Sequence, residues 1–333
     1  MDELIAELRQ RQAASLELGG ASRVERQHNQ GKLTARERIA LLFDDGSFEE
    51  LGQLATHVYT PVTTIPNKHT PADGVLTGFG KIEGRQAAVV AEDFTILGGS
   101  LGINNFIKKT RMIELAQRDK LPIVWLFDGA GARTDEFIGE GLAPMHHFMQ
   151  VAKLSGVTPQ IAGVLGPCAG DSSLLPAMME FIVMVEGTAM LAAGGPPLVK
   201  MGTGEDVTKE ELGGTDLHCR ISGVADNRAV DDADAIRQIR RYLSYMPTNT
   251  YEYPPYVEPE DSPDRRDEDL AGILPENKRR PYDMMKIINK VVDQDSFFEI
   301  KPDFAKMMIT GLARMNGHAV GIIANQPKVM AGA

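Results

Sequence analysis

The sequence has 333 residues, of which 43% are hydrophobic and 24% are charged, and its formal net charge is −11. This length and hydrophobic content are enough for one large or two medium-sized domains with a substantial core. The acidic balance argues against nucleic acid or an anionic membrane surface as the main partner, so an anionic substrate would need a local group of basic residues.

Cysteine usage and the N-terminal segment indicate the compartment. Cys168 and Cys219 are too few for a disulfide framework and lack the paired spacing of a zinc ribbon, so a reducing interior fits best. The segment MDELIAELRQRQAASLELGG mixes acidic and basic residues without a continuous apolar core, which is not the pattern of a signal peptide. No apolar run is long enough to span a bilayer, so we expect a cytoplasmic protein with no membrane partner.

Two helices are predicted near the N-terminus. Residues 1–20 predict the first, which ends at a pair of glycines and carries one apolar side made of Leu4, Ile5 and Leu8. The second begins at Ala35, because Thr34 and Glu37 stand three residues apart in the pattern of a capping box. Its buried side would hold Ile39 and Leu42.

Between residues 75 and 195 one pattern occurs three times: an apolar run, a glycine-rich turn and a helical segment. The three runs are AAVVAEDFTILGGSLG, PIVWLFDGAGART and QIAGVLGPCAGD. Apolar runs without alternation are typical of strands covered on both faces, so they predict an α/β protein, a layered sheet with flanking helices. The segment EFIVMVEGTAMLAAG predicts two further short strands.

A second capping box, formed by Thr208 and Glu211, predicts a short helix further along the chain. Asp231 or Asp232 would cap the longer helix that follows.

Residues 256–275 form the best candidate for a linker, because they are rich in proline and charge and lack periodicity. We therefore divide the chain into an N-terminal domain, 1–255, and a second unit that starts at residue 276. In this unit YDMMKIINKVVDQDSFFEI predicts a helix and a strand, and Asn316-Gly317 predicts the turn of a hairpin.

The glycine-rich turns at the ends of three strands are the strongest indication of a site. Small residues at a helix start leave main-chain N–H groups unpaired, with the positive end of the helix dipole behind them, and such groups stabilise an oxyanion. Close packing of a strand on a helix selects the same small residues, and for one turn alone the two interpretations are equally good. Three turns at one sheet edge favour a site, because open α/β sheets bind ligands there.

Several common catalytic motifs are missing from these turns. The Lys-Ser/Thr pair of a P-loop is absent, GEGLAP and GGPPLVKMGTG do not match a dinucleotide-binding fingerprint, and there is no GxSxG nucleophile elbow. Glu140, His146 and His147 lack a further matched ligand, so we expect no metal site.

Lys108 and Arg111 lie three residues apart on the helix after GGSLG and would share a face. Together with the start of that helix they could hold a phosphate-bearing ligand, whereas Phe106, Ile113 and Ala116 would be buried on another side. A solvated helix face is the alternative interpretation, and the spacing fits it equally well.

Several segments occur in an order typical of one enzyme family: HNQGKLTARERIALLFDDGSFEEL, FTILGGSLG, DGAGAR, GPCAG, VTKEELGG and SGVA. On these motifs the chain resembles the carboxyltransferase (β) subunits of biotin-dependent acyl-CoA carboxylases, over nearly its whole length from residue 22 onward. The segment FFEIKPDFAKMMITGLARMNGHAVGIIANQPKVMAGA is similar to the propionyl-CoA carboxylase branch of that family.

The resemblance implies a crotonase-like (ClpP/crotonase) fold with two related domains, of which residues 276–333 would be the incomplete start of the second. It also implies a reaction in which a carboxyl group moves from carboxybiotin to the α-carbon of an acyl-CoA through an enolate, this chain supplying the acyl-CoA half of the site. Biotin would be carried by a partner, a biotin carboxylase/biotin carrier subunit or domain. The family forms homo-oligomers built from dimers, typically hexamers.

Site residues follow from the same resemblance. GPCAG places the thioester oxyanion hole at the main-chain N–H groups of Gly170 and Asp171. Residues of DGAGAR and GPCAG would line the acyl pocket, namely Gly129, Gly131, Ala132 and Ala169. Three positions depart from the family pattern: Asp171 replaces a second glycine, Ala130 replaces a glycine and Asp226 replaces a histidine.

Two other functions stay open on the sequence. The same machinery can run in reverse, as the component of a biotin-dependent decarboxylase that acts on a carboxylated acyl-CoA. A noncatalytic assembly subunit would keep the fold while the altered turns had lost their chemistry.

Overall fold

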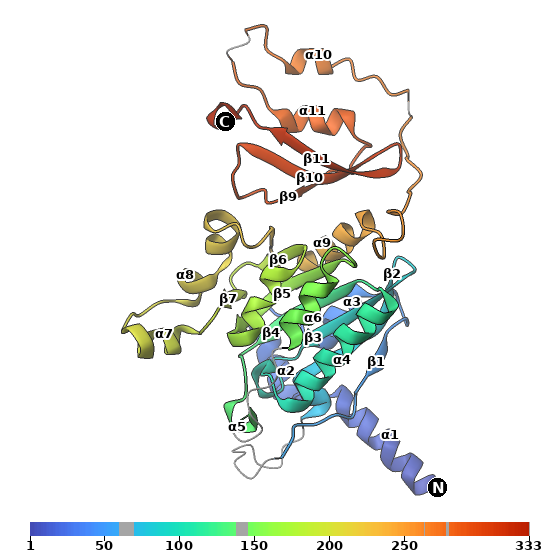
Figure 1. Ribbon diagram of the computed structural model, residues 1–333, viewed down its shortest axis with the longest axis vertical. Helices are drawn as coiled ribbons and strands as arrows, with labels where there is room; N and C mark the ends of the chain where they lie inside the picture. Colours follow the sequence, from blue (N-terminus) through green and yellow to red (C-terminus); the bar gives the residue numbers. More distant parts are fainter. Residues whose placement is uncertain (60–69, 138–145, 263, 278–279, 333) are drawn as a thin grey trace.

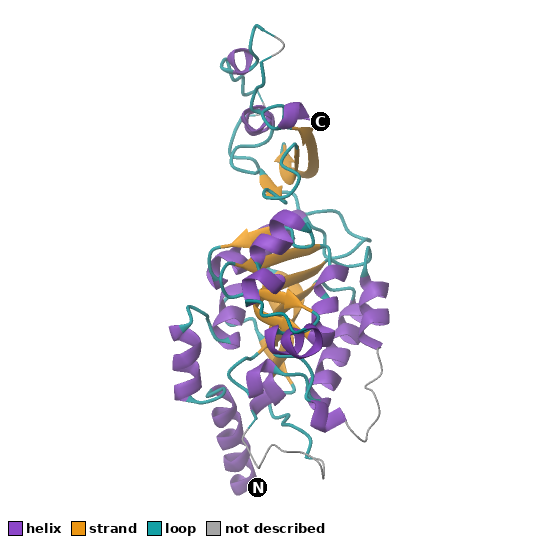
Figure 2. Cartoon of the chain, turned by 90° about the vertical axis from the view of Figure 1, so that its left-hand side faces the viewer, coloured by secondary structure: helices purple, strands orange, loops and turns teal. Residues whose placement is uncertain are grey.

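The computed structural model describes residues 1–59, 70–137, 146–262, 264–277 and 280–332. Most of these residues form a body with a central sheet between helices, and a smaller sheet near the C-terminus stands at one end of it (Figure 1). Seen from the side, the strands of the body lie inside and the helices outside (Figure 2). The layered α/β architecture expected from the sequence is therefore present.

The large sheet has the strand order β1-β2-β3-β4-β5-β6-β8, and β7 pairs with β5. The pairs β1–β2 and β2–β3 are antiparallel, and all other pairs are parallel. Its strands are β1 (Glu49–Leu51), β2 (Val75–Ile82), β3 (Arg85–Glu92), β4 (Ile123–Gly129), β5 (Gln160–Ala169), β6 (Phe181–Val185), β7 (Met190–Ala192) and β8 (Asn227–Ala229).

Helices cover both faces of this sheet. One face carries α3 (Ala35–Leu42) and α9 (Asp232–Tyr245), and the other carries α4 (Ile103–Asp119) and α6 (His146–Leu154). The other helices of the described chain are α1 (Asp2–Leu16), α2 (Ala21–Asn29), α5 (Thr134–Phe137), α7 (Pro196–Thr203), α8 (Lys209–Gly213), α10 (Leu270–Ile273) and α11 (Met284–Val291).

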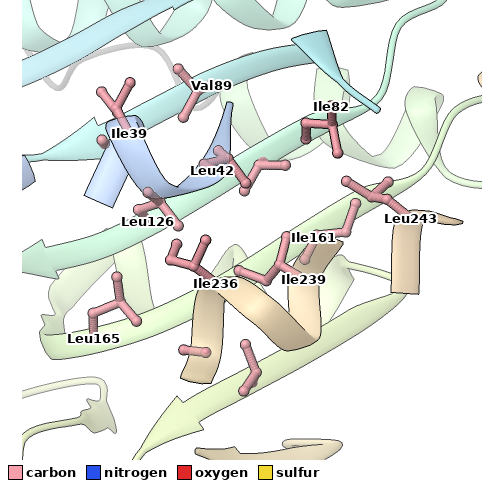
Figure 3. Packing of buried hydrophobic residues seen from close by; sticks show 14 of the residues in the cluster. Ile39, Leu42, Ile82, Val89, Leu126, Ile161, Leu165, Ile236, Ile239 and Leu243 are labelled. Carbon is pink, nitrogen blue, oxygen red and sulfur yellow. The ribbon is translucent and has the colours of Figure 1, made fainter. Parts of the chain in front are cut away.

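Strand β4 shows why the apolar runs do not alternate. All its residues are buried, and successive side chains enter opposite faces of the sheet. Leu126 packs against α3 and α9, as Figure 3 shows, whereas Trp125 and Phe127 lie in the cluster beneath α4 and α6. A strand covered on both faces needs apolar residues at every position, so the prediction from the three runs is confirmed.

The predicted helix caps are formed. The Thr34 hydroxyl accepts the N–H of Glu37 at 3.3 Å, and the Glu37 carboxylate accepts the N–H of Thr34 at 2.7 Å. Thr208 and Glu211 repeat this arrangement at α8. Asp231, one of the two candidates, caps α9 by accepting the N–H of Asp234 at 2.7 Å.

Two local predictions need correction. The first helix ends at Leu16 and a separate helix, α2, follows it, although the sequence analysis identified no helix there. The α2 segment ASRVERQHN is almost entirely polar, so it lacks the apolar periodicity on which such predictions depend. The turn after β5 leads into short 3₁₀ segments rather than an α-helix.

Helix α1 projects from the body in both views (Figures 1 and 2). Leu4, Ile5 and Leu8 are respectively 64%, 41% and 45% exposed. The spacing of the three residues places them on one side of the helix as expected, and that side is only partly covered by the described part of the chain.

The C-terminal unit contains a three-stranded antiparallel sheet covered by α11. Its strands are β9 (Phe298–Ile300), β10 (Met308–Met315) and β11 (His318–Asn325). Asn316 and Gly317 form the tight turn between β10 and β11, with φ of 49° and 78°, as the Asn-Gly pair predicts.

One aromatic side chain anchors this unit to the body. Phe298 is 6% exposed and belongs to the core cluster beneath α9, where its ring meets that of Phe181 at 5.8 Å. Lys301 pairs with Asp226 at 3.0 Å, and the amide of Asn227 donates to the carbonyl oxygen of Glu299 at 3.0 Å. The two units are thus joined by an apolar contact flanked by polar ones.

Candidate functional site

The three glycine-rich turns come together at one edge of the large sheet, at the carboxyl ends of β3, β4 and β5, and we call this edge the rim. The turns after β3 and β4 are joined by main-chain hydrogen bonds. The carbonyl oxygen of Gly98 accepts the N–H of Ala130 at 2.9 Å, and that of Gly131 accepts the N–H of Leu101 at 2.8 Å. The expected convergence of the turns is therefore present.

The turns after β4 and β5 lie against each other, and each has a glycine whose main-chain conformation disfavours other residues. Gly131 has φ of +94° and Gly170 has φ of +66°, a region that disfavours other residues. A methyl group on Gly131 would lie 3.4 Å from the carbonyl oxygen of Ala169, and one on Gly170 would lie 3.6 Å from the Cα of Gly131. Both distances are ordinary van der Waals contacts, so the positive φ values, and not a lack of space, favour glycine at these two positions.

One predicted donor is already used. The Gly170 N–H donates to the carbonyl oxygen of Ala193 at 3.2 Å, because β7 pairs with β5 and extends its ladder into the turn. The expectation that this N–H is free for an oxyanion is therefore corrected. Among the described residues no main-chain acceptor is found for the N–H groups of Asp171, Gly131 and Ala132.

The three departures from the family pattern occupy two different environments. The side chains of Asp171 and Ala130 are exposed at the rim. Asp226 lies elsewhere, between β6 and β8, where its carboxylate accepts the N–H of Ile182 at 2.7 Å and pairs with Lys301. Burial raises the pKa of Asp226, although both partners favour its charged form.

Glu92, at the end of β3, is buried next to the rim and binds the main chain of β4. It is 2% exposed and accepts the ammonium group of Lys109 at 2.6 Å and the main-chain N–H of Asp128 at 2.9 Å. A methyl group on Gly129 would lie 2.6 Å from this carboxylate. Gly129 therefore makes room for Glu92, and the structure gives it this packing role beside the predicted acyl pocket.

Asp128 is the centre of a second buried cluster. Its carboxylate, which is 0% exposed, accepts Lys32 at 2.6 Å, Arg38 at 2.8 Å and the amide of Gln27 at 3.0 Å. Arg38 also donates to Asp232 at 2.7 Å. Burial lowers the pKa of Lys32, and the neighbouring Asp128 opposes this effect. The cluster ties α2, α3 and α9 to the residue that precedes the β4 turn.

Arg133 fixes the other side of the β4 turn. Its guanidinium group donates to Asp73 at 2.6 Å, to Glu136 at 3.0 Å and to the carbonyl oxygen of Ser100 at 2.8 Å. The other carboxylate oxygens of Glu136 and Asp73 accept the N–H groups of Ile103 and Asn105 in the first turn of α4. Two of the N–H groups in the first turn of α4 are thus bound by carboxylates of the protein itself.

The predicted pair of Lys108 and Arg111 is not formed. Lys108 is 7% exposed, and its ammonium group donates to the carbonyl oxygens of Ala72, at 2.9 Å, and Val75. Burial lowers its pKa to about 8. Arg111 is exposed, so the two side chains diverge. Because Lys108 and the start of α4 are both engaged, the phosphate site expected there is corrected.

No group of three or more potential metal ligands is found in the part of the chain that the structure describes. The ring of His147 stacks on Phe106 at 4.0 Å and lies 2.7 Å from the hydroxyl of Thr110. Glu140 lies outside the described residues. Within the described ranges, no helix has the length and apolar character needed to cross a membrane.

Comparison with known proteins identifies the same family that the motifs of the glycine-rich turns resemble. Residues 26–333 match the model of the carboxyl transferase domain family. The chain belongs to this family. The carboxyltransferase subunit of propionyl-CoA carboxylase from Haloferax mediterranei is 42% identical over 336 residues, which cover 100% of this chain and 64% of the relative. The methylmalonyl-CoA decarboxylase subunit alpha of Veillonella parvula is 45% identical over 314 residues, covering 94% of this chain and 62% of the relative.

A solved structure confirms the fold. Transcarboxylase 12S, crystallised with hydrolysed methylmalonyl-coenzyme A, matches with a TM-score of 0.93 at 39% identity, covering 100% of this chain and 64% of that chain. The fold is therefore the crotonase-like α/β fold expected from the sequence. The chain spans less than two thirds of the length of these relatives.

Sequence reasoning missed the charged residues that support the rim. Glu92, Asp128 and Arg133 stand inside or beside the apolar runs, in AAVVAED, WLFDG and GAGAR. A charge at the end of a strand that is otherwise fully apolar is itself a signal, because buried charges need partners. The partners come from distant parts of the chain, and no local pattern identifies them.

Proposed function

We propose that this chain supplies the acyl-CoA half of a carboxyltransferase site, in which a carboxyl group is added to the α-carbon of an acyl-CoA. The observation that carries the proposal is the group of main-chain N–H donors at the rim, from Asp171, Gly131 and Ala132, that have no acceptor in the described part of the chain. Carboxybiotin on a partner protein would supply the carboxyl group as the second substrate.

The rim is suited to stabilise negative charge on the thioester oxygen. Removal of a proton from the α-carbon leaves an enolate, whose oxygen carries charge until the new carbon–carbon bond forms at the α-carbon. Fixed N–H donors stabilise this charge without reorganisation, and one such donor accounts for about 10²- to 10³-fold in rate. The buried clusters around Glu92, Asp128 and Arg133 keep the main chain of the turns rigid.

Asp171 allows the donor role to be tested separately from its side chain. It is the second residue of a 3₁₀ turn and has no acceptor inside that turn, so proline there removes the N–H without breaking a helical bond. In the full-length protein with its biotin-carrying partner, Asp171→Pro should lower kcat by about 10²- to 10³-fold. Incorporation of labelled bicarbonate into the acyl-CoA measures the effect.

Asp171→Gly is the matched control, because it removes the carboxylate and keeps the N–H. This variant should retain activity or exceed it, since a negative side chain beside an enolate is unfavourable. Equal losses in the proline and glycine variants would show that the side chain, and not the N–H, matters.

For the substrate and the direction of the reaction, we favour carboxylation of a small acyl-CoA of the propionyl type. The relative from Haloferax mediterranei is named for propionyl-CoA carboxylase, and the structure of transcarboxylase 12S contains hydrolysed methylmalonyl-coenzyme A. Assays of the full-length protein with acetyl-, propionyl- and butyryl-CoA test this choice, and we expect the highest kcat/KM with propionyl-CoA.

We further propose that the full-length protein assembles as a dimer-based homo-oligomer in the cytoplasm and works with a biotin carboxylase/biotin carrier partner. Support comes from transcarboxylase 12S, whose solved structure is a hexamer assembly. Native mass spectrometry of the full-length protein should give a multiple of a dimer, and a monomer would contradict the proposal.

A further inference from the structure

The carboxylate of Glu92 connects the ends of the three strands that form the rim. Glu92 is itself the last residue of β3. Its Oε2 accepts the main-chain N–H of Asp128, near the end of β4, at 2.9 Å. Its Oε1 accepts the ammonium group of Lys109 at 2.6 Å and lies 3.5 Å from the hydroxyl of Ser172, in the turn after β5. One side chain therefore contacts both of the turns that carry the N–H donors.

The two contacts of Glu92 lie close in the sequence to those donors. Ser172 directly follows Asp171, and both belong to the 3₁₀ segment Gly170–Leu174. On the other turn, Asp128 stands three residues before Gly131. The separation of the two groups of donors therefore depends on how residues 128 and 172 are held, and Glu92 contacts both.

The end of β4 needs a side-chain acceptor because the sheet is irregular there. The pairing of β3 with β4 stops at Leu126, and the register between β4 and β5 shifts between Phe127 and Gly129. The N–H of Asp128 lies beyond the regular ladder, and Glu92 provides its acceptor. An N–H group that is buried without an acceptor is costly, so this bond fixes the main chain where the β4 turn begins.

Stability alone does not account for a charged pair at this place. Glu92 is 2% exposed and Lys109 is 1% exposed, and apolar side chains of similar volume commonly replace such a buried pair without loss of stability. Apolar side chains cannot accept the N–H of Asp128. The property that distinguishes Glu92 from an apolar residue is therefore the position of its oxygens against the two turns.

We propose that Glu92 is a positioning residue for carboxyl transfer, which fixes the N–H donors of the β4 turn relative to that of the β5 turn, while Lys109 neutralises its charge. The inference rests on the proposed function, because the separation of the donors matters only if a thioester oxygen lies between them. Glu92 acts through the main chain and touches neither substrate. Its loss should therefore lower kcat, since donors that are misplaced by about 1 Å cost about 100-fold in rate.

Two double variants, both without the buried charges, separate positioning from stability. Glu92→Met with Lys109→Met fills a similar volume with apolar atoms and has no acceptor for the N–H of Asp128. Glu92→Gln with Lys109→Met keeps an acceptor oxygen for that N–H and an amide that faces Ser172. In the full-length protein with its biotin-carrying partner, the Met variant should lose about 10- to 100-fold in kcat with KM for propionyl-CoA unchanged. The Gln variant should recover most of this loss.

A third variant decides the question if the Met variant does not fold, which urea unfolding shows. Glu92→Asp keeps the charge beside Lys109 and withdraws the carboxylate by one methylene group, so it should lower kcat by about tenfold with KM unchanged. A structural role alone would lower the free energy of unfolding and leave kcat of the folded protein as in the wild type.

The inference is overturned if the folded Met variant, or in its place the Asp variant, has the kcat of the wild type. It is also overturned if the Gln variant loses as much as the Met variant. Absence of carboxylation by the wild-type protein would instead contradict the proposed function, and the inference with it.

Discussion

Lys108 illustrates how a single residue can look like a ligand in the sequence and serve the main chain in the structure. Its ammonium group faces the carbonyl oxygens of Ala72 and Val75, with Glu50 and Asp73 as the nearby acidic groups and Arg36 as a nearby basic one. Burial outweighs the acidic neighbours, so the folded protein favours the neutral amine more than the unfolded chain does.

This burial predicts a particular dependence of stability on pH. The pKa of Lys108 is lowered from 10.5 to about 8, so between these values the unfolded chain binds more protons than the folded one. The penalty of the buried charge is present in full below pH 8 and is relieved as the pH rises to 10.5. The change amounts to about 3 kcal/mol in the free energy of unfolding.

Replacement of Lys108 by Met should remove this rise. Urea unfolding at a series of pH values should therefore show that the free energy of unfolding of the wild type increases relative to that of the variant between pH 8 and 10.5. Lys108→Arg is the control, because an arginine does not titrate in this range and should also lack the rise. If the free energy of unfolding of the wild type changed with pH in parallel with that of both variants, the pKa of Lys108 would not be lowered by folding.

At the scale of elements, short sequence motifs predicted the structure correctly where the interaction they form is between residues close in the sequence. Both capping boxes are formed as predicted, but they belong to helices of different importance. Thr34 is 3% exposed and starts α3, whose Ile39 and Leu42 lie in the core (Figure 3). Thr208 is exposed and starts α8, in which Gly213 is the buried residue.

Removal of the two caps should therefore have unequal effects. Thr34→Ala should lower the free energy of unfolding by about 1 kcal/mol, because the cap is coupled to the packing of α3. Thr208→Ala, the matched control, should lower it by less than half of that amount, since α8 adds little to the core. Chemical denaturation measures both, and equal losses would contradict the coupling.

Most of the elements, though not their partners, could be predicted from the sequence. The strands β3, β4 and β5 were predictable because burial on both faces requires continuous apolar runs. Two outcomes depended on contacts between distant segments: the N–H of Gly170 is taken by Ala193, and Lys108 turns toward residues 72–75. Neither contact leaves a trace in the spacing of residues nearby, so the sequence predicted the rim but not that the N–H of Gly170 is already used.

At the scale of the whole molecule, the C-terminal unit is joined to the body by apolar packing, ion pairs and hydrogen bonds, among them those from Arg241 to the carbonyl oxygens of Asp295 and Phe297. Phe298 provides the apolar part, between Phe181 and Tyr245, and Lys301 with Asp226 provides a charged part. The rim lies at the edge formed by the ends of β3, β4 and β5, and none of its residues contributes to this junction.

Phe298→Ala should therefore loosen the C-terminal unit without weakening the binding of acyl-CoA. Loss of a buried aromatic side chain costs about 3 to 5 kcal/mol, which is enough to raise the rate of proteolysis in residues 256–275. Ile323→Ala, at a side chain that is 78% exposed on β11, is the control and should be cut at the wild-type rate. A weaker affinity for propionyl-CoA in the Phe298 variant would connect the junction to the rim.

The carboxylate of Asp128 also constrains how this protein can change over generations. Lys32 and Arg38 pair with it in the interior, and Arg38 also pairs with Asp232, so the loss of one member leaves a partner's charge buried with fewer opposite charges around it. Substitution of one of these residues alone should destabilise the protein, whereas simultaneous replacement of the whole cluster by apolar residues of similar volume should be tolerated. We therefore expect related sequences to keep or replace these buried residues together. The exposed Asp171 and Ala130 should differ between relatives that use different acyl groups.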